Sequence, residues 1–120
     1  MLPTLVSIDR VDADRNERRD LWRMLTADNV GHAGATAGVA DYHPRSDEAG
    51  DEPPALGAAH ARPEVYFVLA GSGMLHTPDN ALELTVGDAF LIPGGVPHTI
   101  EGTNGTALRA FYVSLKGAAT

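Results

Sequence analysis

The chain contains no cysteine, and this absence removes three kinds of chemistry. Without thiols there can be no disulfide, no thiolate-bound metal and no cysteine nucleophile. Long apolar runs are also missing: the longest span about five to seven residues, whereas a membrane-crossing helix needs roughly 18. Residues 1–10 lack the basic segment and apolar stretch of a signal peptide. We therefore expect a soluble protein of the cytoplasm.

Basic residues are scarce as well. The chain has 9 Lys plus Arg against 16 Asp plus Glu, which gives a formal net charge of -7. A surface of this sign repels the phosphates of nucleic acids and anionic membranes. Arg15, Arg18 and Arg19 are interrupted by Glu17 and Asp20, so they form no basic cluster. We expect neither nucleic acid nor membrane as a partner.

What the chain does contain is a β pattern over the length of one domain. Its 120 residues, 43% of them hydrophobic, suit a single globular domain spanning 1–120. Short runs of β-forming residues are separated by Gly and Pro turns, which is typical of a sandwich or barrel. Strands are predicted at residues 5–8, 35–42, 65–70, 74–77, 81–86, 89–92, 96–101 and 108–115.

Two segments depart from this pattern. In residues 12–25, Leu21, Trp22 and Leu25 lie at helical spacing, which predicts a short helix or a loop. At most one short helix is expected in the chain, within residues 14–25. Residues 44–56 are rich in proline and acidic side chains, and they predict a flexible loop that overhangs the mouth of a barrel.

The most specific motif lies in residues 87–102, which read GDAFLIPGGVPHTIEG. Gly87 is followed at fixed spacing by Pro93, Gly95 and His98. This resembles the second motif of the cupin superfamily, G(X)5PXG(X)2H(X)3N, with Gly102 in the place of the final Asn. The glycines and the proline suit tight turns, and they send His98 back along an antiparallel strand.

The first cupin motif, G(X)5HXH(X)3,4E(X)6G, is present in part. His60, Glu64 and Gly71 match its second His, its Glu and its last Gly, while Ala58 stands where the family has its first His. Glu52 replaces the leading Gly. Together the two motifs imply an all-β, single-domain cupin: a double-stranded β-helix, or jelly-roll barrel.

The same resemblance implies a metal site in the barrel. The family's ligands fall on His60, Glu64 and His98, which would hold one divalent ion. This donor set suits Fe(II) first and also accepts Mn, Ni, Co, Cu or Zn. Each residue has a simpler interpretation: His98 as a buried histidine bonded to a backbone carbonyl, His60 as an exposed loop residue, and Glu64 as the partner of Arg62 or Arg109.

Three further side chains are candidate catalytic groups. Tyr66 shares a strand face with Glu64, so its hydroxyl is expected to line the pocket. His76 and His43 are candidates for proton transfer, with a surface role as the alternative. His32 is interpreted as a turn residue.

Several functions are compatible with these residues. The first is a metal-dependent enzyme that acts on a small organic molecule, of the oxygenase, isomerase, lyase or cyclase type. The alternative is a non-enzymatic barrel that binds a small ligand and has lost its metal chemistry, as Ala58 suggests. A third is a structural subunit of a larger assembly. A homodimer is predicted, because a strand at residues 5–8 would need a sheet edge to pair with.

Overall fold

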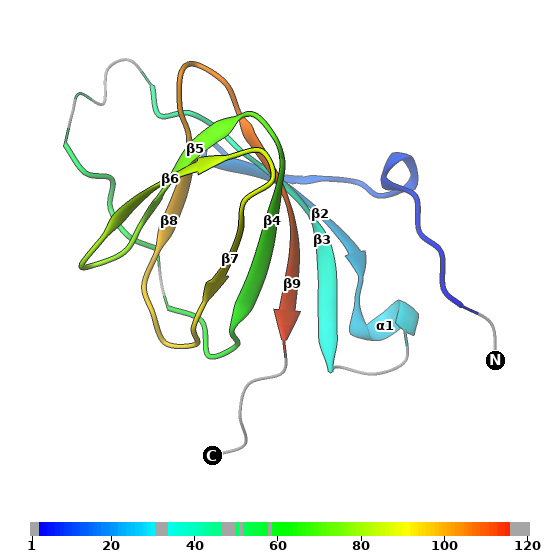
Figure 1. The fold of residues 1–120 in the computed structure, drawn as a ribbon. Helices are drawn as coiled ribbons and strands as arrows, with labels where there is room; N and C mark the ends of the chain where they lie inside the picture. Colours follow the sequence, from blue (N-terminus) through cyan, green and yellow to red (C-terminus); the bar gives the residue numbers. More distant parts are fainter. Residues whose placement is uncertain (1–2, 31–33, 47–49, 51, 58, 116–120) are drawn as a thin grey trace.

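The computed structural model describes residues 3–30, 34–46, 50, 52–57 and 59–115, and strands dominate it (Figure 1). There is a 3₁₀ turn at Ile8–Arg10 and a four-residue helix, α1, at Ala27–Val30. The strands are β1 (Asp14–Arg15), β2 (Arg19–Leu25), β3 (Ala35–Tyr42), β4 (Glu64–Ala70), β5 (Ser72–His76), β6 (Ala81–Thr85), β7 (Ala89–Ile92), β8 (Thr99–Gly102) and β9 (Leu108–Leu115). No helix among the described residues has the length and apolar character needed to cross a membrane.

The strands form two sheets. Six make one sheet in the order β1-β2-β3-β9-β4-β7, and three make the other in the order β6-β5-β8. Every pair of named strands is antiparallel. Sheet neighbours such as β3 and β9 are far apart in sequence, as in a jelly roll. The all-β jelly-roll prediction is confirmed.

Both sheets contribute to one core. The six-stranded sheet supplies Tyr66, Val68 and Leu108, and the three-stranded sheet supplies Leu75 and Ile100. Along β4 and β9 the buried side chains alternate with more exposed ones, because successive residues point to opposite faces. Fully burying a side chain such as Leu108 contributes about 1.5–3 kcal/mol. Tyr66 and Ile100 of this core also line a cavity between the sheets.

Residues 14–25 form neither the predicted short helix nor the predicted loop; they contain the hairpin β1–β2. The carbonyl of the Asn16 side chain accepts the backbone N–H groups of Arg18 and Arg19, at 2.8 and 2.9 Å, and so closes the turn. β2 then pairs along its length with β3. This non-local pairing overrides the local helical spacing. The short helix occurs just after the segment, as α1.

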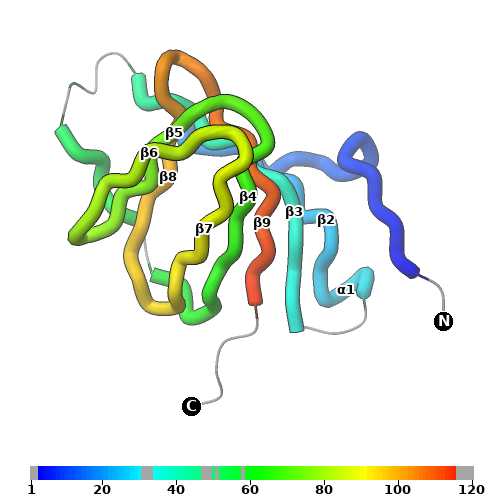
Figure 2. The backbone as a smooth tube through the Cα atoms, viewed as in Figure 1, coloured from blue at the N-terminus to red at the C-terminus, as the bar shows by residue number. Residues whose placement is uncertain are grey.

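The predicted first strand at residues 5–8 is also absent. Leu5 is 91% exposed, and the chain turns at Ile8–Arg10 before it reaches β1. Figure 2 shows this segment lying beside the six-stranded sheet and away from β5, β6 and β8. Residues 5–8 therefore pair with no sheet edge, and the edge strand of the six-stranded sheet on this side is β1.

The other strands differ from prediction mainly at their ends. The turn predicted at residues 71–73 is made by Gly71 alone, with φ at +80°, and β5 starts at Ser72. A Cβ at Gly71 would lie 2.1 Å from the Ala107 carbonyl oxygen, so only glycine fits. β8 starts at Thr99 and not at residue 96, which leaves His98 in the turn just before the strand.

The described parts of the loop at residues 44–56 are bonded to β8. Arg45 donates to both carboxylate oxygens of Glu101, at 2.9 and 2.6 Å. The Thr99 hydroxyl donates to the Ala55 carbonyl at 2.8 Å, and the Gly57 N–H donates to the His98 carbonyl at 2.8 Å. Residues 47–49 and 51 lie outside the described residues, and the flexibility of the loop stays a prediction. These bonds hold the segment that leads to His60 against the strand that follows His98.

Candidate metal centre

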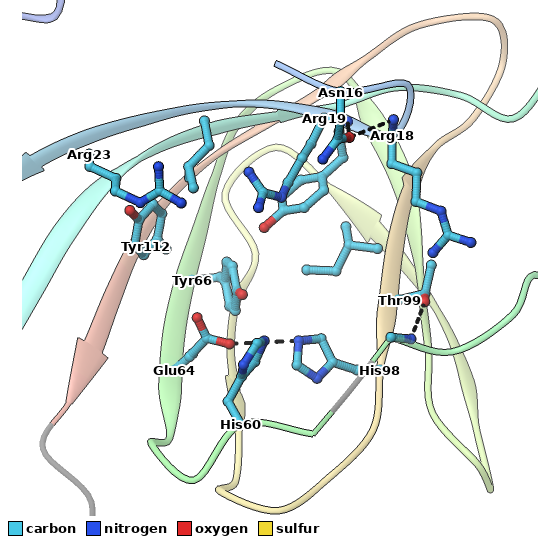
Figure 3. Close-up of a pocket in the computed structure, with 14 residues that line it drawn as sticks. Asn16, Arg18, Arg19, Arg23, His60, Glu64, Tyr66, His98, Thr99 and Tyr112 are labelled. Carbon is cyan, nitrogen blue, oxygen red and sulfur yellow. Dashed lines mark hydrogen bonds and ion pairs between the residues drawn. The ribbon is translucent and has the colours of Figure 1, made fainter. Parts of the chain in front are cut away.

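A cavity of about 430 Å³ opens between the sheets at the end where β4 and β8 begin (Figure 3). The three predicted ligands lie on its wall. Glu64 is the first residue of β4, His98 directly precedes β8, and His60 lies in the segment that leads into β4. Their candidate ligand atoms all lie within 4.8 Å of one another.

Backbone bonds hold the three residues in place. The Gly95 N–H donates to the His60 carbonyl at 2.7 Å, which ties the ligand segment to the turn of the second motif. Glu64 pairs in register with Ile92 of β7 and with Ser114 of β9. The turn chemistry of Pro93 and Gly95 therefore fixes the position of His60 as well as that of His98.

The His98 ring has one nitrogen free for a ligand. Its Nδ1 lies 2.9 Å from the Val96 carbonyl oxygen, which can only accept, so Nδ1 carries the proton. In the neutral imidazole Nε2 is then the lone-pair atom, and it lies 3.6 Å from Glu64 Oε1. A backbone bond that orients the ring and fixes the tautomer is the usual second-shell support of a metal-bound histidine. The predicted backbone bond of His98 is present, and it is compatible with metal binding.

Glu64 has a buried oxygen without a hydrogen-bond partner. Its Oε1 is inaccessible to solvent and accepts no hydrogen bond from the described residues. The predicted alternative partner Arg109 is bonded to Asp41, at 2.7 and 2.9 Å. Arg62 donates through Nε to the Leu115 carbonyl at 2.8 Å. A buried carboxylate oxygen left in this state is costly, and a cation is the partner that would relieve it.

These observations fit a divalent ion. Two imidazoles and one carboxylate converge, with the His60 and His98 rings edge-to-face at a centroid distance of 5.5 Å. Ligand bonds of roughly 2.0–2.2 Å to a shared ion require only small side-chain movements from this arrangement. His60 is exposed, so one side of the site faces solvent. Ala58, where the family has a further His, lies outside the described residues.

Tyrosines make up the wall beside the three ligands. Tyr66 is buried and stacks on Phe90 at a centroid distance of 4.7 Å. Burial raises the pKa of the Tyr66 hydroxyl far above its ordinary value, and the neighbouring Tyr42 and Glu64 raise it further. Burial also raises the pKa of Tyr42 to about 12. Both hydroxyls therefore keep their protons at neutral pH.

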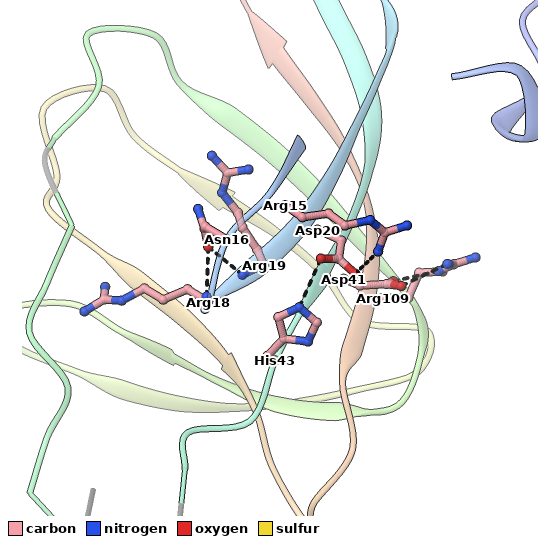
Figure 4. A network of polar contacts seen from close by, with 8 residues as sticks. All are labelled: Arg15, Asn16, Arg18, Arg19, Asp20, Asp41, His43 and Arg109. Atoms are coloured by element: carbon pink, nitrogen blue, oxygen red, sulfur yellow. Dashed lines mark hydrogen bonds and ion pairs between the residues drawn. The ribbon is translucent and has the colours of Figure 1, made fainter. Parts of the chain in front are cut away.

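Neither of the other two candidate histidines is among the described residues that line this cavity. His76 Nε2 donates to Glu101 Oε1 at 2.9 Å, under the loop that contains Arg45. His43 Nε2 donates to Asp20 Oδ1 at 3.2 Å, on the other side of the sheet edge (Figure 4). Tyr42 faces the cavity, and the next residue points away, as successive strand residues do. His32 lies outside the described residues.

The sequence analysis missed the basic part of the wall. Arg19, Leu21 and Arg23 of β2 line the cavity, and Arg18 joins them from the turn. The signal was the alternation of these residues, which share one face only if the segment is a strand. Helical spacing of neighbouring apolar residues obscured that alternation.

Comparison with known proteins finds solved structures that share this fold. No curated protein matches the chain. Among solved structures, a predicted oxalate decarboxylase from Thermotoga maritima superposes with a TM-score of 0.75 at 20% identity, covering 93% of this chain and 98% of that one. The polyketide cyclase RemF from Streptomyces resistomycificus gives 0.75 at 22% identity, covering 95% and 80%. The Fe(II) form of HppE gives 0.74 at 15% identity, covering 93% and 60%.

These identities establish a shared fold and leave activity open. The sequence model of the cupin domain family matches residues 48–114, a stretch that includes both motifs and all three candidate ligands. That match covers more than half of the chain. The chain belongs to the cupin family.

Proposed function

We propose that this cupin is an enzyme that uses one divalent metal ion, held by His60, Glu64 and His98, to transform a small organic molecule. The observation that carries the proposal is the buried, unpartnered Oε1 of Glu64, which faces the Nε2 lone pair of His98 at 3.6 Å. Fe(II) is the first candidate for the ion, because two histidines and a carboxylate with open positions suit it. The relative HppE has a form with Fe(II).

The chain's own residues then have distinct tasks. When bound, the ion would polarise an oxygen of the substrate as a Lewis acid. Tyr66 lies within the same wall, and its raised pKa makes it a neutral donor that can hold a proton toward the substrate. The apolar side chains of Leu21 and Ile100 exclude water from part of the cavity.

The alternative is a binding barrel without metal chemistry. It takes its support from Ala58, where a family ligand is missing. In that case Tyr66 and His98 would bind an organic ligand by hydrogen bonds. The two functions differ in metal content, which makes them easy to separate.

The test is elemental analysis of the protein purified without chelator, followed by titration of the metal-free protein with Fe(II), Mn, Co, Ni and Zn. We expect close to one ion per chain and a rise in Tm on metal addition, since a ligand that binds only the folded state stabilises it. Glu64→Gln removes the one anionic ligand and should weaken binding at least about tenfold. If the protein holds no metal above background and none of the ions changes its Tm, the metal-dependent function is contradicted. The non-enzymatic ligand-binding barrel would then replace it.

We also propose a homodimer, through a surface other than the one predicted. The outer face of the six-stranded sheet carries Val65, Phe67, Leu69, Leu91 and Phe111, all at least partly exposed. Register places Val65 beside Leu91 and Phe67 beside Phe111, so these side chains form one patch. A contiguous apolar patch of this kind favours association.

Sedimentation is expected to give twice the 12.6 kDa of one chain. Phe67→Glu places a charge in the patch and should shift the protein to monomer at micromolar concentration. Leu82→Glu is the matched control, because Leu82 is equally exposed but lies on β6, outside the patch. A wild-type monomer at that concentration would refute the dimer.

A further inference from the structure

The cavity wall is basic although the chain as a whole is acidic. Its net formal charge is -7, yet the charged residues among the described lining are Arg18, Arg19 and Arg23 against Glu64 alone. A partly enclosed site with excess positive charge concentrates anions. The imbalance points to the kind of molecule that enters the cavity.

Arg19 is the strongest part of this arrangement. Its Nη1 is buried and has no hydrogen-bond partner among the described residues. Figure 3 shows its guanidinium directed from the top of the cavity toward the side occupied by Tyr66 and Glu64. A guanidinium presents paired N–H donors that match the two oxygens of a carboxylate or phosphate. The buried N–H groups of Arg19 Nη1 can therefore donate to an anionic oxygen of a molecule bound in the cavity.

The two other arginines frame Arg19. Arg23 is four residues further along β2, on the same face. Among the described residues it forms an ion pair with Asp14 at 3.0 Å, where both side chains are about half exposed. The Arg18 side chain has no bond to a described residue, and it lies beside Thr99 in Figure 3. Arg23 and Arg19 both act to lower the pKa of Tyr112, against the rise caused by burial, so their charges are felt at the cavity wall.

The basic residues on the opposite face have partners already. Arg15 is paired with Asp20 at 2.7 Å, and Arg109 with Asp41 at 2.7 Å. Figure 4 shows these pairs set apart from the side chains of Arg18 and Arg19. On the inner face Arg23 is paired with Asp14, whereas Arg18 and Arg19 have no ion pair with a described residue. The inner face therefore keeps positive charge, while the arginines of the outer face are neutralised by their partners.

We infer that the cavity takes a small organic anion, whose carboxylate or phosphate group is bound by Arg19 with Arg23 and Arg18 beside it. The remainder of the molecule would extend toward His60, Glu64 and His98. Only this second part rests on the proposed function; binding of the anionic group needs no metal. Arg19 is a substrate-binding and specificity residue in this scheme.

The test is calorimetric titration of the metal-free full-length protein with malonate, with methylphosphonate, and with neutral malonamide. Binding of either anion, and none of malonamide, is expected. Arg19→Gln should weaken anion binding at least about tenfold, the effect of losing a charge-assisted bidentate pair. Arg15→Gln is the matched control and should stay within about twofold of wild type. Whichever anion binds identifies a carboxylate or a phosphorylated substrate.

Three results would overturn the inference: no binding of either anion, equal binding of malonamide, or wild-type anion affinity in a folded Arg19→Gln protein. If Arg19→Gln fails to fold, Arg19→Lys and the comparison of malonate with malonamide on wild type decide the matter. Metal titration of Arg19→Gln separates this inference from the proposed function, because metal affinity should stay within about threefold of wild type. If wild type binds the anions but no metal, only the proposed metal-dependent function is contradicted. If it binds metal but neither anion, only the inferred anion site is contradicted.

Discussion

Replacing His98 with alanine is expected to abolish stoichiometric metal binding while the fold survives. The imidazole supplies one of three ligands, and its orientation is set by the Val96 carbonyl. Loss of residues that only support a ligand costs 10–100-fold in affinity, so loss of the ligand itself should cost more than about 100-fold. Because the side chain lines a cavity and not the packed core, Tm should fall by only a few degrees.

Metal titration followed by calorimetry and by thermal melting measures both quantities. His43→Ala is the matched control, since His43 is bonded to Asp20 and does not line the cavity. It should keep wild-type metal affinity to within about twofold. Tight metal binding by His98→Ala, or equal losses in the two variants, would contradict the assigned site.

The largest effect on stability is expected at Glu101. Its side chain is 11% exposed and accepts hydrogen bonds from Arg45, at 2.9 and 2.6 Å, and from His76 at 2.9 Å. Glu101→Ala leaves both donors without their acceptor and releases Arg45 from β8. Breaking one side of a buried charge network costs about 3–5 kcal/mol, and the partial exposure of Arg45 favours the lower end. For a domain of this size that corresponds to roughly 10–15 °C in Tm.

Glu83→Ala on β6 is the control, because the Glu83 side chain is exposed and forms no hydrogen bond or ion pair with a described residue. This substitution should change the free energy of unfolding by less than about 0.5 kcal/mol. Thermal and urea unfolding measure both variants. Similar stabilities for the two would show that the network contributes little.

The same network predicts an acid-sensitive stability. The Arg45 bond holds the pKa of Glu101 below its usual value of 4.5, burial opposes it, and His76 adds to the lowering. The folded state therefore binds the carboxyl proton less tightly than the unfolded state. This contribution is complete above pH 4.5 and is lost as the pH falls through the lowered pKa. In Glu101→Gln the unfolding free energy should vary less with pH below that value.

The all-β barrel, and the two motifs that contain the three candidate ligands, could be predicted from the sequence alone. The spacing of Gly87, Pro93, Gly95 and His98 is local turn chemistry, so a single stretch of residues places the histidine. β4 was recognisable because residues 65–70 are six consecutive apolar residues rich in β formers. The ligand role of these residues stays a prediction until metal is measured.

The arginine face of β2 could not be predicted in this way. Leu21, Trp22 and Leu25 satisfy a helical period, and the strand exists because Arg19 and Trp22 pair with residues 42 and 39 of β3. Such pairing is invisible in a local window. Leu5–Ile8 shows the converse: apolar residues with strand propensity that form no strand. The local sequence pattern limits which secondary structures a segment can form, and pairing within the sheet determines which of them it adopts.

Trp22 gives β2 its own fluorescence signal. It is the sole tryptophan in the chain, and the guanidinium groups of Arg15 and Arg109 lie over its ring, 5.6 and 5.3 Å from the ring centroid. Its emission therefore reports on one strand, the one whose reverse face carries Arg19 and Arg23. Comparing the fluorescence transition with the far-ultraviolet circular dichroism transition shows whether β2 opens before the rest of the barrel. An early opening would mean that the anion-binding wall can be lost while the three-ligand site persists.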